Sequence, residues 1–153
     1  MKREKIFNLN YDYWIYKNEK IFNHFGQLWQ QLKNLPDPFL QEKIKNTKVE
    51  FMFSRGSFSC TISTTGIHPI IIIFPDLYNL LLDQTIEKNR LALAILAHEL
   101  GHIYSLNKNI ENEQLADLFV LKLGYKKELL NLLSSLKELY PNCKQRYEFL
   151  LNY

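Results

Sequence analysis

Cysteine is scarce in this chain, and its two cysteines lie far apart. Cys60 and Cys143 form neither the multi-cysteine pattern of a disulfide framework nor a CxxC pair. The sequence therefore excludes a disulfide-stapled domain and a zinc ribbon. It predicts instead that both residues are free, buried thiols.

A long apolar run and a dense basic block are also missing. The most apolar run, residues 70–82, is too short to span a bilayer and is interrupted by Pro75, Asp76 and Asn79. The charged N-terminus is not followed by the apolar segment of a signal peptide. The net charge of +3 is spread along the chain, without the basic stripe that phosphate binding needs. We therefore expect a soluble, cytoplasmic protein that has neither a membrane nor a nucleic acid as a partner.

The chain is long and apolar enough to form one folded domain. It has 153 residues, of which 46% are hydrophobic and 14% are aromatic. We expect a single domain over residues 1–153, with an aromatic, helical N-terminal segment at 1–45. Within that segment, alternation suggests an extended stretch at 7–15, and helical spacing predicts a helix from about Asn18 to Leu35 and a shorter one over 38–45.

Residues 49–74 carry the pattern of short strands. Apolar and polar residues alternate over 49–53 and 57–63, and 70–74 is continuously apolar. Glycine-containing turns separate these stretches, and tight turns join antiparallel strands, so we expect a small, mostly antiparallel sheet. Helical patterns follow to the end of the chain, which gives an α+β protein with a helical second half. The helices are expected at 77–82, 86–106, 110–123 and 129–139, and from 142 onward.

The most informative stretch is the apolar run 91–97 followed by the sequence HELGH at 98–102. Residues i and i+4 of an α-helix share one face, so His98 and His102 present two imidazoles side by side. This spacing suits two ligands of a tetrahedral Zn²⁺ ion. Glu99 lies at the edge of the same face, where it can act as general base on a water at the metal, as in the HExxH arrangement of metallopeptidases. Burying such residues is costly unless they are paired, which argues against a chance pattern.

A catalytic zinc ion takes a third protein ligand and keeps one position open. The extended motif HExxHxxGxxH does not supply this ligand, because Ser105 and Lys108 occupy its last glycine and histidine positions. We expect Glu113, on the following helix, to bind the metal. Asp117 lies one turn later on the same face and can accept a hydrogen bond from a ligand histidine, while the small Ala116 allows the two helices to approach. A solvated acidic face is the alternative interpretation.

The HELGH sequence followed by Glu113-Gln114-Leu115-Ala116-Asp117, an ExxAD pattern, resembles the gluzincin metallopeptidases. It is most similar to the CAAX prenyl endopeptidase branch and to the small soluble minigluzincins. The order of strand, short helix and HExxH helix is also similar, as is the spacing from Pro141 to Arg146. The resemblance covers a catalytic core at 46–153 with a zincin-like arrangement, and it gives no counterpart for residues 1–45.

The resemblance also implies a role for each matching residue. The implied zinc ligands are His98, His102 and Glu113, and Glu99 is implied as the general base. Asp117 and Arg146 would support the ligands and organise the charge beside them. Tyr140 stands where the family usually has histidine, and its phenol can also donate a hydrogen bond to a developing oxyanion. Tyr140 is therefore a candidate catalytic residue.

Together these patterns predict a zinc-dependent metalloendopeptidase that acts on a protein or peptide. An extended substrate would pair with an edge strand at 57–63, so the candidate substrate-binding residues are Phe58, Ser59, Cys60 and Thr61. Two alternatives remain at this point. One is a zinc-binding regulatory or interaction protein, latent or acting on a single partner. The other is a purely structural helical protein that binds no metal.

Overall fold

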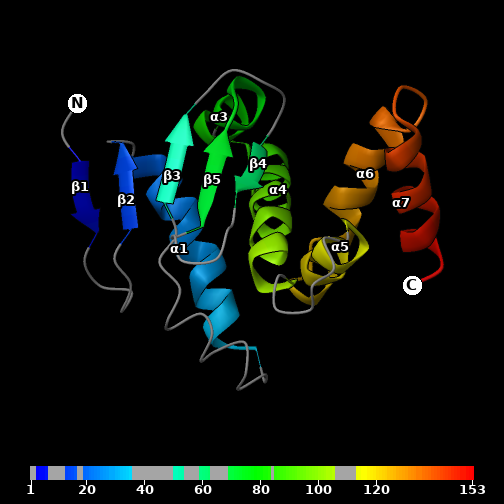
Figure 1. The fold of residues 1–153 in the computed structure, drawn as a ribbon, viewed down its shortest axis with the longest axis horizontal. Coiled ribbons are helices and arrows are strands. Elements are labelled where there is room, and N and C mark those ends of the chain that lie inside the picture. Colours follow the sequence, from blue (N-terminus) through cyan, green and yellow to red (C-terminus); the bar gives the residue numbers. More distant parts are fainter. Residues whose placement is uncertain are drawn as a thin grey trace.

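The computed structural model describes residues 3–6, 13–16, 19–35, 50–53, 59–62, 69–83, 85–105 and 113–153. Figure 1 shows a sheet of short strands on one side, a central helix, and further helices on the other side. The strands are β1 (Arg3–Ile6), β2 (Tyr13–Tyr16), β3 (Glu50–Phe53), β4 (Ser59–Ile62) and β5 (Ile70–Ile73). The helices are α1 (Glu19–Lys33), α3 (Pro75–Leu82), α4 (Ile86–Ser105), α5 (Glu113–Lys122), α6 (Lys126–Leu136) and α7 (Pro141–Leu151).

The expected α+β fold with a mostly antiparallel sheet is wrong. Helices make up most of the described residues, and each described strand has only four residues. The strand order is β1-β2-β3-β5-β4, and both the β2–β3 and the β3–β5 pairings are parallel. The prediction assumed that strands joined by a turn would lie side by side in the sheet. Instead β3 pairs with β5, and β4 lies at the edge of the sheet, as expected for 57–63, where it runs antiparallel to β5.

Helix α4 forms the centre of the molecule. Every residue from Ala92 to Gly101 is buried, as its apolar sequence predicts. Helices α1, α3, α5 and α6 and strand β4 all pack against it. Apolar side chains of α1, α3 and β5 complete this core, and each exposes no more than 1% of its surface. They are Leu28, Leu32, Leu77, Leu81, Ile71 and Ile73. The HELGH sequence therefore lies at the point where the layers of the fold meet.

The helices otherwise agree closely with the sequence pattern. Helix α1 lies within the expected 18–35, and α4 to α7 begin and end within a few residues of their expected bounds. Gly124 ends α5 with a φ of 81°, a conformation that favours glycine. The expected helix at 38–45 and most of the expected extended stretch at 7–15 lie outside the described residues. Within the described ranges, no helix combines the length and apolar character that a membrane crossing requires.

Candidate metal site

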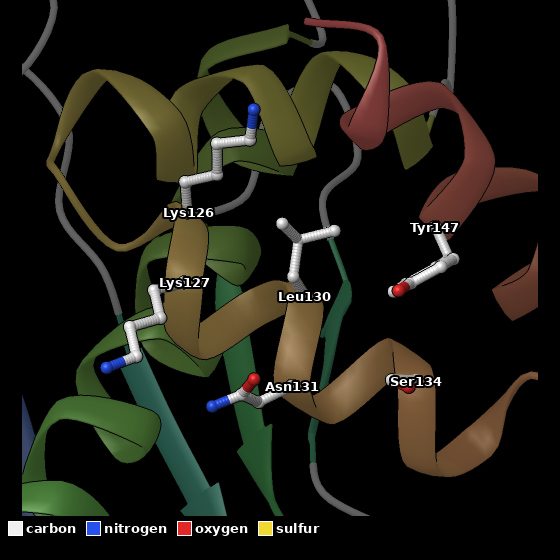
Figure 2. A pocket seen from close by; sticks show the side chains of 6 residues that line it. All are labelled: Lys126, Lys127, Leu130, Asn131, Ser134 and Tyr147. Atoms are coloured by element: carbon white, nitrogen blue, oxygen red, sulfur yellow. The ribbon is translucent and has the colours of Figure 1, made fainter.

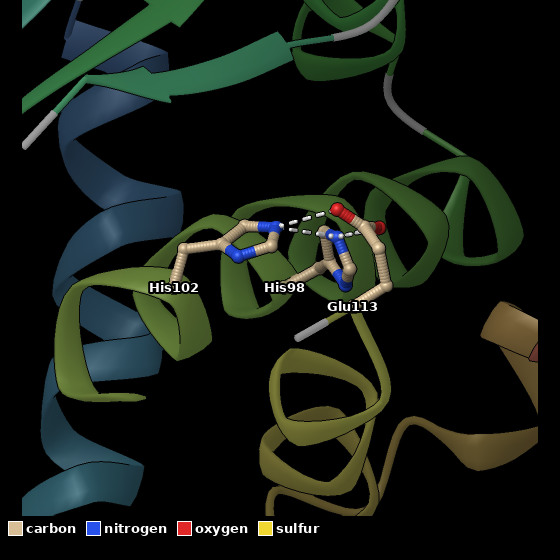
Figure 3. Close-up of side chains that lie close together, drawn as sticks. All are labelled: His98, His102 and Glu113. Carbon is tan, nitrogen blue, oxygen red and sulfur yellow. Dashed lines mark hydrogen bonds and ion pairs between the residues drawn. The ribbon is translucent and has the colours of Figure 1, made fainter. Parts of the chain in front are cut away.

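Three side chains from two helices converge at one point, and together they could hold a metal ion. His98 and His102 extend from α4, and Glu113 reaches them from the first turn of α5 (Figure 3). The Nε2 atoms of the two histidines are 3.0 Å apart. The carboxylate oxygens of Glu113 lie 3.3 Å from Nε2 of His98 and 3.4 Å from Nε2 of His102.

These separations fit the ligands of one tetrahedral ion. Metal bonds of about 2.0–2.1 Å to nitrogen and oxygen give a tetrahedron whose edges measure about 3.3–3.4 Å. The observed separations are close to this length, with Oε2 of Glu113 beside His98 and Oε1 beside His102. The site is also accessible on one side, because the Glu113 side chain is 40% exposed whereas that of His98 is only 11% exposed. The cluster can thus supply three protein ligands and leave a fourth position to solvent.

A close approach between helices brings Glu113 to the histidines. A Cβ atom placed on Gly101 would lie 2.6 Å from the Cα and 2.8 Å from the carbonyl oxygen of Ala116. Only glycine fits opposite the backbone of α5 at this distance. Gly101 lies between the histidines in sequence and Ala116 lies one turn after Glu113, so the contact sets the distance between the ligands.

Asp117 fixes the orientation of His98. Its carboxylate is completely buried, and its Oδ1 lies 2.9 Å from Nδ1 of His98. An Nδ1–H that donates to Asp117 leaves the Nε2 lone pair of His98 facing Glu113 and His102, and we assign the tautomer from this contact. Nε2 of His98 therefore faces the candidate site, because Nδ1 of the same ring is hydrogen-bonded to Asp117.

Arg146 of α7 connects both carboxylates. Its Nε and Nη2 donate to the two oxygens of Asp117 at 2.9 and 2.7 Å, and its Nη1 lies 2.8 Å from Oε2 of Glu113. The resemblance to the gluzincins implied that Arg146 lies near the site, but it did not indicate this bidentate pair. Such an arrangement fixes both partners more strongly than a single contact would.

The electrostatic environment favours charged carboxylates. Hydrogen bonds with His102 and then His98 hold the pKa of Glu113 well below its usual value. Burial acts to raise the pKa of Asp117, but its hydrogen bonds with His98 and Arg146 outweigh burial and lower the pKa. Burial likewise acts to lower the pKa of His98, whereas its bonds to Asp117 and Glu113 raise it above the usual value. The cluster is thus a set of mutually compensated charges.

Glu99 is held by the edge strand β4. The Ser59 hydroxyl donates to its Oε1 at 2.8 Å, and the Thr61 hydroxyl donates to its Oε2 at 2.6 Å. Ser59 and Thr61 were expected to contact a substrate, so their contact with Glu99 was missed. The polar residues that line one face of strand β4 could have indicated this contact, because that face points toward α4.

The remaining expected site residues are Phe58, Cys60 and Tyr140. Phe58 lies outside the described residues, as does the side chain of Cys60. Tyr140 directly precedes α7, is 54% exposed, and takes part in none of the interactions described above. Cys143 is a free, partly buried thiol, as expected.

A separate pocket of about 460 Å³ lies between α6 and α7 (Figure 2). Its lining consists of Lys126, Lys127, Leu130, Asn131, Ser134 and Tyr147. It contains none of the candidate metal ligands and no carboxylate, histidine or cysteine. This pocket is therefore separate from the candidate metal ligands.

Comparison of the chain with protein-family models, with curated proteins and with solved structures gives no match.

Proposed function

We propose that this chain is a zinc-dependent metalloendopeptidase that hydrolyses a protein or peptide substrate. The observation that supports it most is the convergence of His98, His102 and Glu113 at separations that suit one tetrahedral ion. Two histidines and one glutamate, with a fourth position open, are the ligand set of catalytic zinc in several metallopeptidases. The resemblance of HELGH and ExxAD to the gluzincins supports the same assignment.

The donor types favour zinc over other common ions. Calcium and magnesium take oxygen ligands almost exclusively, whereas imidazole nitrogen combined with carboxylate oxygen suits zinc. A zinc ion held there would supply a water of lowered pKa and a Lewis acid toward a carbonyl oxygen. Asp117 and Arg146 would keep His98 and Glu113 oriented for it.

The protein's own residues would then move the protons. Glu99 follows His98 directly and, as general base, would take a proton from water and return it to the leaving amine. The exposed phenol of Tyr140 remains a proposed donor to the oxyanion.

The decisive experiment is Glu99→Gln, with metal content and casein hydrolysis measured on the same preparation. We expect the variant to retain zinc, because Glu99 is not among the three ligands, and to lose about 10²–10⁴-fold in hydrolysis rate. Wild-type hydrolysis should disappear with a chelator and return with zinc. Full hydrolysis by Glu99→Gln would contradict the assignment of the base.

The alternatives give different results in the same assay. A wild-type protein that binds zinc without any chelator-sensitive hydrolysis would support a zinc-binding regulatory or interaction protein. A protein that binds no metal would support a structural role. Either result would overturn the peptidase proposal.

A further inference from the structure

Both oxygens of the Glu99 carboxylate accept a hydrogen bond from strand β4. Ser59 and Thr61 occupy alternate positions of this strand, so their side chains leave it on the same face. Thr61 also lies 3.2 Å from the carbonyl oxygen of Glu99, but its contact with Oε2 is only 2.6 Å. A hydroxyl has one proton to donate, so the shorter contact to the carboxylate takes it.

Glu99 is buried, so its carboxylate depends on the hydrogen bonds from Ser59 and Thr61. Glu99 is only 5% exposed and is followed by the fully buried Leu100. An ionised carboxylate at such a position is costly unless it is hydrogen-bonded. Ser59 and Thr61 are its hydrogen-bond partners among the residues that the structure describes. Hydroxyl bonds to a charged acceptor belong to the stronger kind, so they fix the rotation of the carboxylate.

The hydroxyls orient the carboxylate without blocking it. An ionised carboxylate has about four acceptor sites, and two hydroxyl bonds leave one site free on each oxygen. The free sites can still accept a proton from water. The two contacts are therefore compatible with general-base action by Glu99, and they restrict the directions from which it can accept.

Strand β4 also forms the edge of the described sheet. It pairs with β5 on one side, and the strand order places no other described strand beyond it. An extended peptide can add to such an edge by main-chain hydrogen bonds. We propose that Ser59 and Thr61 are positioning residues, which orient Glu99 from the same strand along which a peptide substrate pairs. This inference rests on the proposed peptidase function.

The test compares Thr61→Val, which keeps the side-chain shape but removes the donor, with Thr61→Ser, which keeps the hydroxyl. Casein hydrolysis and zinc affinity are measured for each variant and for Ser59→Ala. We expect Thr61→Val to lower kcat by about 10–100-fold, since small misplacement of a reacting group has effects of this size. KM and zinc affinity should stay within about twofold of wild type, and Thr61→Ser should recover most of the rate. Ser134→Ala, at an exposed position of α6, is the matched control.

A purely structural role for the hydroxyls would give a different pattern. If they act through Glu99, adding Thr61→Val to Glu99→Gln should reduce the residual rate no further. In the metal-free protein, the double variant Thr61→Val with Glu99→Gln should shift the urea unfolding midpoint by an amount that differs from the sum of the two single shifts. Additive effects in both measurements, or a wild-type kcat in Thr61→Val, would overturn the inference while leaving the peptidase function intact. A wild-type protein without chelator-sensitive hydrolysis would remove the proposed function, and the positioning role with it.

Discussion

Nε2 of His102 lies 3.4 Å from a carboxylate oxygen of Glu113, although the two residues belong to different helices. Two histidines one turn apart are a local property of α4, and any helix with this sequence would present them together. The third donor is different, because it depends on how closely α5 packs against α4. The relationship between His102 and Glu113 is therefore the contact on which metal binding depends.

Removing the third donor should abolish tight metal binding. We expect Glu113→Gln to lower zinc affinity by more than the 10–100-fold that loss of an outer partner typically costs. A competition titration with a chromophoric chelator measures this directly. Glu87→Gln, at an exposed position of α4, should leave the affinity unchanged. Equal affinities in the Glu113 variant and the wild type would exclude Glu113 as a ligand.

Asp117 should matter for both the metal and the fold. We expect Asp117→Asn to weaken zinc binding by about 10–100-fold, because a neutral amide replaces the charged acceptor that orients His98. Asp117→Ala should also lower the free energy of unfolding by about 1–3 kcal/mol, since Nε and Nη2 of Arg146 lose their partner in a largely buried site and only its contact with Glu113 remains. Urea denaturation of the metal-free protein measures the second effect. A loss below about 1 kcal/mol would show that the pair does not stabilise the fold.

The two glycines that lie inside described helices should respond oppositely to alanine. At Gly101 the new methyl group would overlap the backbone of Ala116, so α5 must move, and we expect a loss of about 1–3 kcal/mol in stability and weaker zinc binding. At Gly26 of α1 a Cβ atom meets nothing within 4 Å, so alanine should stabilise the helix by up to about 1 kcal/mol. Thermal unfolding of both variants measures these two effects. A Gly101→Ala variant more stable than wild type would contradict the close approach of Gly101 to Ala116.

Metal affinity should increase with pH through the neutral range. Burial acts to lower the pKa of His98, but its hydrogen bonds to Asp117 and Glu113 outweigh burial. The pKa of His98 therefore lies above its usual value. The metal binds the neutral imidazole, so a proton competes with the metal until the pH exceeds this raised pKa. Cobalt titrations at about pH 6, 7 and 8 would measure the trend. An affinity that is already constant above about pH 6.5, the ordinary histidine pKa, would contradict the raised pKa.

Local patterns in the sequence predicted most of the helices and the pair of histidines that could bind a metal ion. Helical periodicity and helix-ending residues such as Gly124 depend on near neighbours in the chain, and so does the i, i+4 pairing of His98 and His102. Glu113 and Asp117 were also predicted, because a second helix with two acidic residues one turn apart follows the first closely. The histidine pair and the helix ends need no knowledge of distant contacts, whereas the approach of Glu113 to the histidines depends on the packing of α5 against α4.

The tertiary structure alone decided the sheet and the partners of Glu99. Pairing of β3 with β5 is a non-local choice that the intervening turns do not indicate, and it places β4, the expected edge strand, beside α4. Ser59 and Thr61 then face a buried carboxylate instead of solvent, and Arg146 reaches Glu113 and Asp117 from the far end of the chain. The hydrophobic pattern of a strand shows which face is polar, but the packing of the whole chain determines what that face meets.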